Sequence, residues 1–247
     1  MTIASLAMYP FLHLRSAQER LWDGVRSRLS FLAPALDWDL DPFTASRRDD
    51  LVLGQTCGWP LVTELASTVR VLGTFDCDVD GASDGTYCSV IVTNTGVSLA
   101  EVLHRPDLVV AANSPDSLSG WISLQSVAAS AGVRLEAVEW TGAHAASIEA
   151  LREGRVQLAA IDAVSWVHLG GADSGLSVVG HGPRIPCLPL ITSRSSSDAM
   201  VGELRRGLGA TVRDPAMAEA CATLRIRDFL ARDLADYEGI SELAELW

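Results

Sequence analysis

Short apolar segments typical of β-strands alternate along this chain with segments that have the hydrophobic spacing of amphipathic helices. The central strand segments are predicted at residues 51–54, 69–75, 87–93, 108–112, 133–140 and 156–161. Helical spacing separates most of them, as in residues 120–130 and 144–152. This order predicts an α/β fold with a mainly parallel, doubly wound sheet, and 48% hydrophobic residues supply enough apolar surface for one large or two modest globular domains.

The two ends of the chain extend the pattern. Residues 3–8 predict a first strand, and residues 16–29 predict a helix. Short strands are predicted at residues 178–179 and 188–192. Beyond them, residues 198–208 and residues 215 to about 234 predict two helices that complete the fold.

Small or polar residues follow four of the predicted strands, at residues 54–58, 113–120, 141–144 and 162–165. In open α/β sheets, ligands bind outside the carboxyl ends of the strands, where such loops gather. Agreement between four strand ends carries more weight than any single motif. We therefore expect a binding site built from these loops.

Residues 113–120 are the most informative of the four stretches, because they join an apolar strand to a predicted helix. A helix start leaves backbone N–H groups without partners, and Ser117 and Ser119 add hydroxyl donors beside Gly120. This combination predicts a site for an anion. The alternative is an ordinary helix cap followed by a glycine that allows close packing.

Each of the other strand ends offers a candidate with its own alternative. His144 can donate to an anion from a helix start, or its ring can simply pack or cap. Asp162 can accept from a ligand, or it can cap the helix that follows. Thr56 can face a ligand, while Cys57 becomes a nucleophile only if a base lies close by, so cysteine hydrolysis ranks below binding.

The charge and hydropathy of the chain bound its partners and compartment. A net charge of −12 argues against nucleic acid, so an anion must be held by local donors. No apolar run approaches the ~20 residues of a membrane span, and we expect no membrane insertion. Residues 1–10 lack the pattern of a secretion signal, which favours the cytoplasm, with the periplasm as the alternative if the native precursor begins elsewhere.

Cysteine spacing and acidic residues give no sign of a metal or other cofactor, and we expect none. The five cysteines lie far apart and favour reduced thiols, although Cys77 and Cys88 could pair in an oxidising compartment. Residues 76–81 copy the first half of a calcium loop, with Asp84 at its ninth position. Because Tyr87 occupies the twelfth position, where a glutamate is needed, a solvated acidic loop is the better interpretation.

Taken in order, six stretches resemble the phosphate/phosphonate (PhnD-like) substrate-binding proteins of ABC transporters: residues 54–61, 87–92, 113–120, 141–148, 154–162 and 186–191. The resemblance implies a two-lobed type 2 periplasmic-binding-protein fold, with two crossover strands and a ligand cleft between the lobes. One lobe would comprise residues 1–90 and 190–247, and the other residues 91–189. The crossovers would be residues 87–93 and 188–192.

The resemblance also assigns binding roles. The family grips an oxyanion with a helix start of Ser-Thr-Ser-Gly type and a histidine, which correspond here to residues 117–120 and His144. Leu118 replaces the middle hydroxyl, so the site would rely on backbone N–H groups and two serines. Thr56, Cys57 and Tyr87 would contact the ligand from the other lobe or the hinge, and Asp162 would read a polar group.

We therefore expect a binding protein for a small oxyanion-bearing solute. It would be either a substrate-binding protein that docks on the membrane subunits of an ABC transporter or an intracellular relative of such proteins. The alternative is a cytoplasmic biosynthetic enzyme on the same scaffold, since fold does not determine function. Turnover that depends on Cys57, His144 or Asp162 would favour the enzyme. A sensor or regulatory module is a third class.

Overall fold

The computed structural model describes residues 2–243, which form two compact units. Unit 1 contains the described residues up to Asp78, together with Ala82–Thr86 and Pro186–Glu238. Unit 2 contains Val79–Gly81, Tyr87–Ile185 and the described residues from Gly239 on. The main crossings of the chain therefore lie between Thr86 and Tyr87 and between Ile185 and Pro186.

Unit 1 is built on a five-stranded sheet with the order β1-β2-β9-β3-β10. Its strands are β1 (Ile3–Ala4), β2 (Leu51–Gln55), β3 (Val69–Cys77), β9 (Pro189–Ser193) and β10 (Ile226–Ala231). Only β1 and β2 pair in parallel, whereas β9 is antiparallel to both β2 and β3, and β10 is antiparallel to β3. The expectation of a mainly parallel sheet is wrong here, because hydrophobic periodicity reports burial and carries no information on strand direction.

The helices of unit 1 bury one apolar core against this sheet. Trp22 and Val25 of α1 (Arg15–Arg26) and Leu204 and Leu208 of α8 (Asp198–Val212) are all at most 1% exposed and belong to the same cluster. Each such side chain contributes roughly 1.5–3 kcal/mol by leaving water. The remaining helical elements are η1 (Leu12–Leu14), α2 (Pro42–Ser46), α3 (Gly58–Pro60), η2 (Leu61–Leu65), η5 (Pro215–Met217), α9 (Ala218–Thr223) and η6 (Leu234–Tyr237).

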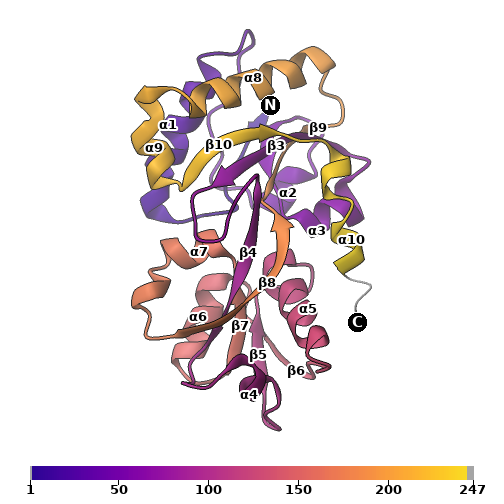
Figure 1. Ribbon diagram of the computed structural model, residues 1–247. Coiled ribbons are helices and arrows are strands. Elements are labelled where there is room, and N and C mark those ends of the chain that lie inside the picture. The colour runs from indigo at the N-terminus through magenta and orange to yellow at the C-terminus, as the bar shows by residue number, and fades with distance from the viewer. Residues whose placement is uncertain (1, 244–247) are drawn as a thin grey trace. The chain divides into compact units, whose positions relative to one another are not determined.

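Strand β10 corrects the prediction of a helix from residue 215 to about 234. Helix α9 ends at Thr223, and Arg225 takes a left-handed conformation with φ of 55°. The chain then pairs with β3 as an extended strand, beside which it lies in Figure 1. Phe229 packs edge-to-face on Phe75, with ring centroids 6.4 Å apart. Because the helix ends without a glycine or proline, the usual sequence signal for its end is absent.

Unit 2 has a second five-stranded sheet, with the order β6-β5-β7-β4-β8. Its strands are β4 (Thr86–Thr93), β5 (Val109–Ala112), β6 (Ala137–Trp140), β7 (Leu158–Ile161) and β8 (Ser177–Pro186). Strand β5 runs parallel to β6 and β7, while β4 is antiparallel to β7. The predicted crossover at residues 188–192 coincides with β9 of the other sheet, so the chain returns to unit 1 at the end of β8 instead.

Helices cover both faces of the sheet in unit 2, as expected for an α/β unit. Ile91 contributes to a core with Leu124 of α5 (Ser123–Ser130), whereas the neighbouring Val92 contributes to a second core with Leu151 of α6 (His144–Arg152). The other helical elements of the unit are α4 (Leu99–Leu103), η3 (Leu118–Ile122), α7 (Ala163–His168), η4 (Gly171–Asp173) and α10 (Ile240–Leu243). None of the helices within residues 2–243 has the length and apolar character needed to cross a membrane.

Candidate functional site

The loops that follow β5, β6 and β7 meet at one edge of the sheet in unit 2, because these three strands are parallel. Backbone bonds join the first two loops: Thr141 N donates to Ala112 O at 2.9 Å, and Gly142 N donates to Asn113 O at 3.0 Å. Three of the four predicted strand ends are thus brought together within one unit. The fourth, residues 54–58, belongs to unit 1.

The helix that begins at Leu118 supplies the centre of this edge. Ser117 is its N-cap, and the hydroxyl oxygen of Ser117 accepts from Gly120 N at 3.0 Å. The first five residues, Leu118–Ile122, wind as a π-helix before α5 continues as an α-helix. Such wide turns are rare and are frequent at functional sites. Ser117 therefore caps the helix, as the alternative interpretation of residues 113–120 predicted. The other N–H groups of the first turn lie at the same edge of the sheet.

Gly120 is held in close contact with Asn113. A Cβ atom at position 120 would lie deep inside the van der Waals radius of Asn113 Oδ1 and 3.0 Å from Ser117 Oγ. Asn113 Oδ1 is itself buried and has no hydrogen-bond partner among the described residues. Only glycine fits between these groups, so residue 120 sets how tightly the helix start approaches the end of β5.

His144 joins the second loop to the helix start. The ring Nε2 lies 3.1 Å from Ser119 Oγ, and the buried Nδ1 has no partner within the part of the chain that the structure describes. Burial lowers the pKa of His144, and the Asp162 carboxylate opposes this by a smaller amount. The ring is therefore neutral near pH 7, and it gains most from a proton when a negative charge comes close.

Asp162 and Tyr87 form a buried pair beside the third loop. Tyr87 Oη donates to Asp162 Oδ2 at 2.6 Å, and Asp162 Oδ1 accepts from Ser165 N at 2.7 Å as the N-cap of α7. Their side chains are 1% and 2% exposed. The capping role that we considered for Asp162 is thus present, and its hydrogen bond to Tyr87 could not be read from the sequence.

Thr56 and Cys57 lie in unit 1, where the strand β2 leads into α3. Thr56 N donates to Pro189 O at 3.2 Å, but its hydroxyl is buried without a partner within the described residues. Cys57 is the N-cap of α3, and a π-helical turn, η2, follows. The two positions therefore combine an unsatisfied donor with a helix start, which is the kind of arrangement found in unit 2.

The strand ends of unit 2 and residues 56–57 of unit 1 offer hydrogen-bond donors rather than a set of metal ligands. Within residues 2–243, no group of three or more His, Cys, Asp and Glu side chains could hold a metal ion, and none of the five cysteines forms a disulfide. Asn113 also belongs to the site in unit 2, although the sequence analysis included it only within residues 113–120. Its place directly after β5 was the one available signal.

The sequence matches the model of one protein family over residues 48–237, and that family is described as ABC transporter, phosphonate, periplasmic substrate-binding protein. Comparison with curated proteins gives no significant match.

Solved structures with a similar fold cover nearly the whole chain. PhnD1 from Prochlorococcus marinus, in complex with methylphosphonate, has a TM-score of 0.75 and 15% identity, covering 99% of this chain and 97% of its own. A binding protein component of an ABC phosphonate transporter from Pseudomonas aeruginosa has a TM-score of 0.69 and 16% identity, covering 93% and 81%. A Xanthomonas citri protein bound to ATP has a TM-score of 0.67 and 15% identity, covering 94% and 93%. These likenesses confirm the type 2 periplasmic-binding-protein fold.

Proposed function

Because this chain belongs to the phosphonate family of periplasmic substrate-binding proteins of ABC transporters, we propose that its ligand is a small phosphonate, phosphate or related oxyanion held at the helix start of unit 2. The pairing of Ser119 Oγ with His144 Nε2 at 3.1 Å carries the proposal. It places a hydroxyl and an imidazole from two strand ends beside the first N–H groups of one helix. Each of these groups can donate to an oxyanion.

Local donors must outweigh the net charge of −12, and the groups at this edge are suited to do so. Ser117 and Ser119 are 5% and 6% exposed, so a bound anion would exchange few of its contacts with water. Leu118 supplies no hydroxyl but keeps its backbone N–H at the helix start. Asp162, Tyr87, Thr56 and Cys57 remain predicted ligand contacts, to be tested one substitution at a time.

Removing a donor should weaken binding measurably. We expect Ser119→Ala and His144→Gln each to raise the Kd for methylphosphonate about tenfold, which is the loss of one hydrogen bond to a charged group. Isothermal titration calorimetry with methylphosphonate, phosphate and methanesulfonate measures this. Ser130→Ala and His181→Gln, at exposed positions of the same unit, are the matched controls. Unchanged affinity in both donor variants, or no binding of any of these anions, would refute the proposal.

Anion affinity should rise as the pH falls. A bound anion raises the pKa of His144, whereas burial lowers it below 6.5 in the free protein, so binding takes up a proton between these two values. Folding stability changes in the opposite direction to anion affinity. As the pH falls, the imidazole is protonated in the unfolded chain before it is protonated in the folded protein, so the free energy of unfolding decreases below pH 6.5. Methanesulfonate is the probe because its charge is constant in this range. A pH slope as steep in His144→Gln as in the unsubstituted protein would assign the effect to another group.

We propose that the protein acts by binding, with the membrane subunits of an ABC transporter as partner. Turnover of a small metabolite that is lost on substituting Cys57, His144 or Asp162 would contradict this. For the compartment we adopt the periplasm, the alternative in the sequence analysis, because the family is described as periplasmic. Cell fractionation tests it against the cytoplasm. Residues 1–90 with 190–247 and residues 91–189 are retained as proposed lobes, which hydrogen exchange with and without ligand can delimit.

A further inference from the structure

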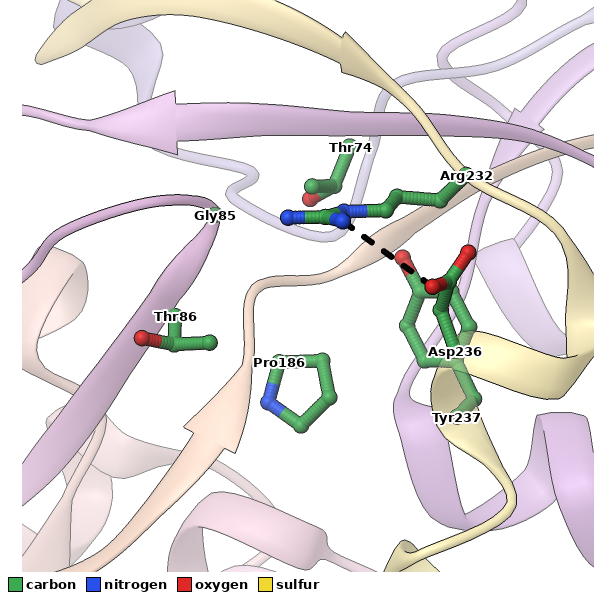
Figure 2. Close-up of a pocket in the computed structure, with 7 residues that line it drawn as sticks. All are labelled: Thr74, Gly85, Thr86, Pro186, Arg232, Asp236 and Tyr237. Atoms are coloured by element: carbon green, nitrogen blue, oxygen red, sulfur yellow. Dashed lines mark ion pairs between the residues drawn. The ribbon is translucent and has the colours of Figure 1, made fainter.

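Unit 1 contains a pocket of about 200 Å³ that is lined by none of the residues proposed to bind the anion (Figure 2). Three side chains of its lining come from one short stretch of the chain. Arg232 directly follows β10, and Asp236 and Tyr237 belong to the short helix η6. Gly85 and Pro186, which precede β4 and end β8, line the opposite part. A cavity of about 150 Å³ holds a benzene-sized molecule, so a pocket of this volume suits a ligand with few heavy atoms.

Tyr237 brings an unsatisfied donor to this pocket. Its side chain is only 1% exposed, and its hydroxyl has no hydrogen-bond partner within the described part of the chain. Burial raises the pKa of Tyr237. The nearby Thr74 hydroxyl lowers this pKa by a smaller amount, although the two hydroxyls do not meet the geometry of a hydrogen bond. The phenol therefore keeps its proton, and a buried donor of this kind costs free energy until an acceptor reaches it.

Arg232 and Asp236 add opposite charges that only partly satisfy each other. Arg232 Nη1 lies 3.9 Å from Asp236 Oδ1, which is too long for a hydrogen bond, and the dashed line in Figure 2 marks this ion pair. Arg232 donates from Nη2 to Asp84 O at 2.8 Å, and Asp236 Oδ2 accepts from Asp233 N at 2.7 Å. Arg232 Nη1 and Asp236 Oδ1 therefore have no hydrogen-bond partner among the described residues, and both can bind a ligand.

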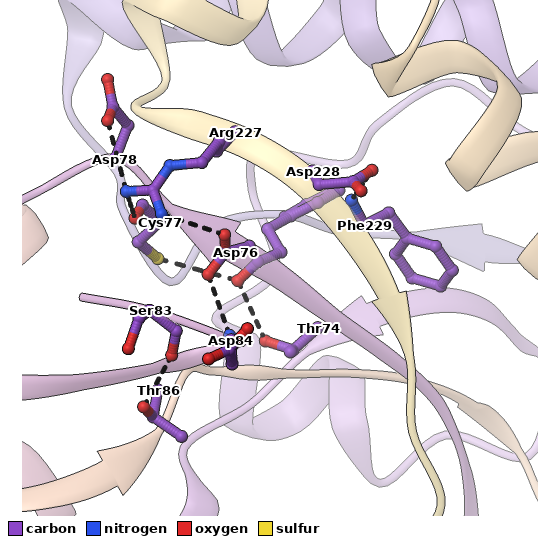
Figure 3. A network of polar contacts seen from close by, with 12 residues as sticks. Thr74, Asp76, Cys77, Asp78, Ser83, Asp84, Thr86, Arg227, Asp228 and Phe229 are labelled. Carbon is purple, nitrogen blue, oxygen red and sulfur yellow. Dashed lines mark hydrogen bonds and ion pairs between the residues drawn. The ribbon is translucent and has the colours of Figure 1, made fainter.

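A network of polar contacts that includes Asp76 and Arg227 (Figure 3) supports the wall of the pocket at Gly85. Gly85 N donates to Asp76 Oδ1 at 2.8 Å, and Cys187 N donates to Gly85 O at 2.8 Å. Asp76 is in turn paired with Arg227 at 3.3 Å. Gly85 has a φ of +70°, and a Cβ there would meet Thr74 Cγ2 at 2.9 Å, so the turn is built for glycine. This wall is therefore preformed.

We propose that this pocket binds a small zwitterion of amino-acid size, with its carboxylate on Arg232 Nη1 and the Tyr237 hydroxyl and its ammonium on Asp236 Oδ1. The carboxylate satisfies both free donors, and the ammonium satisfies the free carboxylate oxygen. A simple anion would meet Asp236 as a like charge, and a simple cation would meet Arg232. Charge complementarity therefore selects a molecule that carries both charges.

Glycine is the probe, with acetate and methylammonium as the single-charge comparisons, and protein NMR titrations give the Kd values. We expect Tyr237→Phe and Arg232→Gln each to weaken glycine binding about tenfold or more. Tyr237→Phe should leave thermal stability unchanged or higher, since it removes an unpaired buried hydroxyl. Tyr9→Phe and Arg194→Gln are the matched controls, because neither residue lines the pocket.

Asp236→Asn separates the zwitterion from a plain anion. It should weaken glycine and strengthen acetate, because the ammonium loses its partner and the acetate loses a like charge. Glycine binding should persist in His144→Gln, which keeps this test independent of the proposed function. Acetate binding as tight as that of glycine, glycine binding unaffected by Tyr237→Phe and Arg232→Gln, or no saturable glycine binding would each overturn the proposal.

Discussion

Replacing Gly120 by alanine is expected to abolish measurable methylphosphonate binding and to destabilise unit 2 by about 1–3 kcal/mol, the usual range for overpacking. The new methyl group would overlap Asn113 Oδ1 and press on Ser117 Oγ. Either the helix start or the end of β5 must then move, and both carry the groups proposed to hold the anion. Calorimetry measures the binding, and hydrogen exchange of α5 measures the local stability.

Gly96→Ala is the matched control for this substitution. A Cβ at Gly96 meets no atom within 4 Å, and its backbone lies outside the left-handed region, so stability should change by at most about 0.5 kcal/mol. Combining Gly120→Ala with Asn113→Ala removes the clashing oxygen and should recover part of the stability. Wild-type affinity in the single Gly120→Ala variant would place the anion elsewhere.

The meeting of Ser119 and His144 could be anticipated from the sequence, because both follow strands that were predicted to lie in one sheet. Parallel neighbours bring their carboxyl ends to a common edge, and β5 and β6 do pair in parallel. The 3.1 Å separation could not be anticipated, nor could the buried and unpartnered Nδ1 of His144. Both depend on the packing of loops, which leaves no periodic trace in the sequence.

Strand β10 and the pocket beside it were missed for a related reason. Residues 226–231 alternate only weakly between buried and exposed, and their pairing partner β3 lies about 150 positions earlier in the chain. Local patterns cannot register a contact at such separation. The pairing of β10 with β3 brings Arg232, and Tyr237 shortly after it, to the pocket. The prediction of a helix from residue 215 to about 234 therefore gave no indication of this pocket.

Asp162→Ala is expected to destabilise unit 2 by about 2–4 kcal/mol, because it removes two buried hydrogen bonds at once. Ser165 N loses its cap, and the Tyr87 hydroxyl is left buried without the carboxylate that it now contacts at 2.6 Å. The pKa of His144 should also fall further, since the carboxylate that raises it is gone. Hydrogen exchange of α7 and an NMR titration of the imidazole measure the two effects.

Asp41→Ala is the matched control, because Asp41 caps α2 through Phe43 N and Thr44 N from an exposed position. It should cost about 1 kcal/mol, as an isolated N-cap does. Tyr87→Phe keeps the cap and removes only the phenolic donor, so the cycle formed with Asp162→Ala isolates the energy of the buried pair. If Asp162→Ala costs no more than Asp41→Ala, the pair with Tyr87 adds nothing to folding. The cap on Ser165 N and the predicted ligand contact would then be the remaining roles of Asp162.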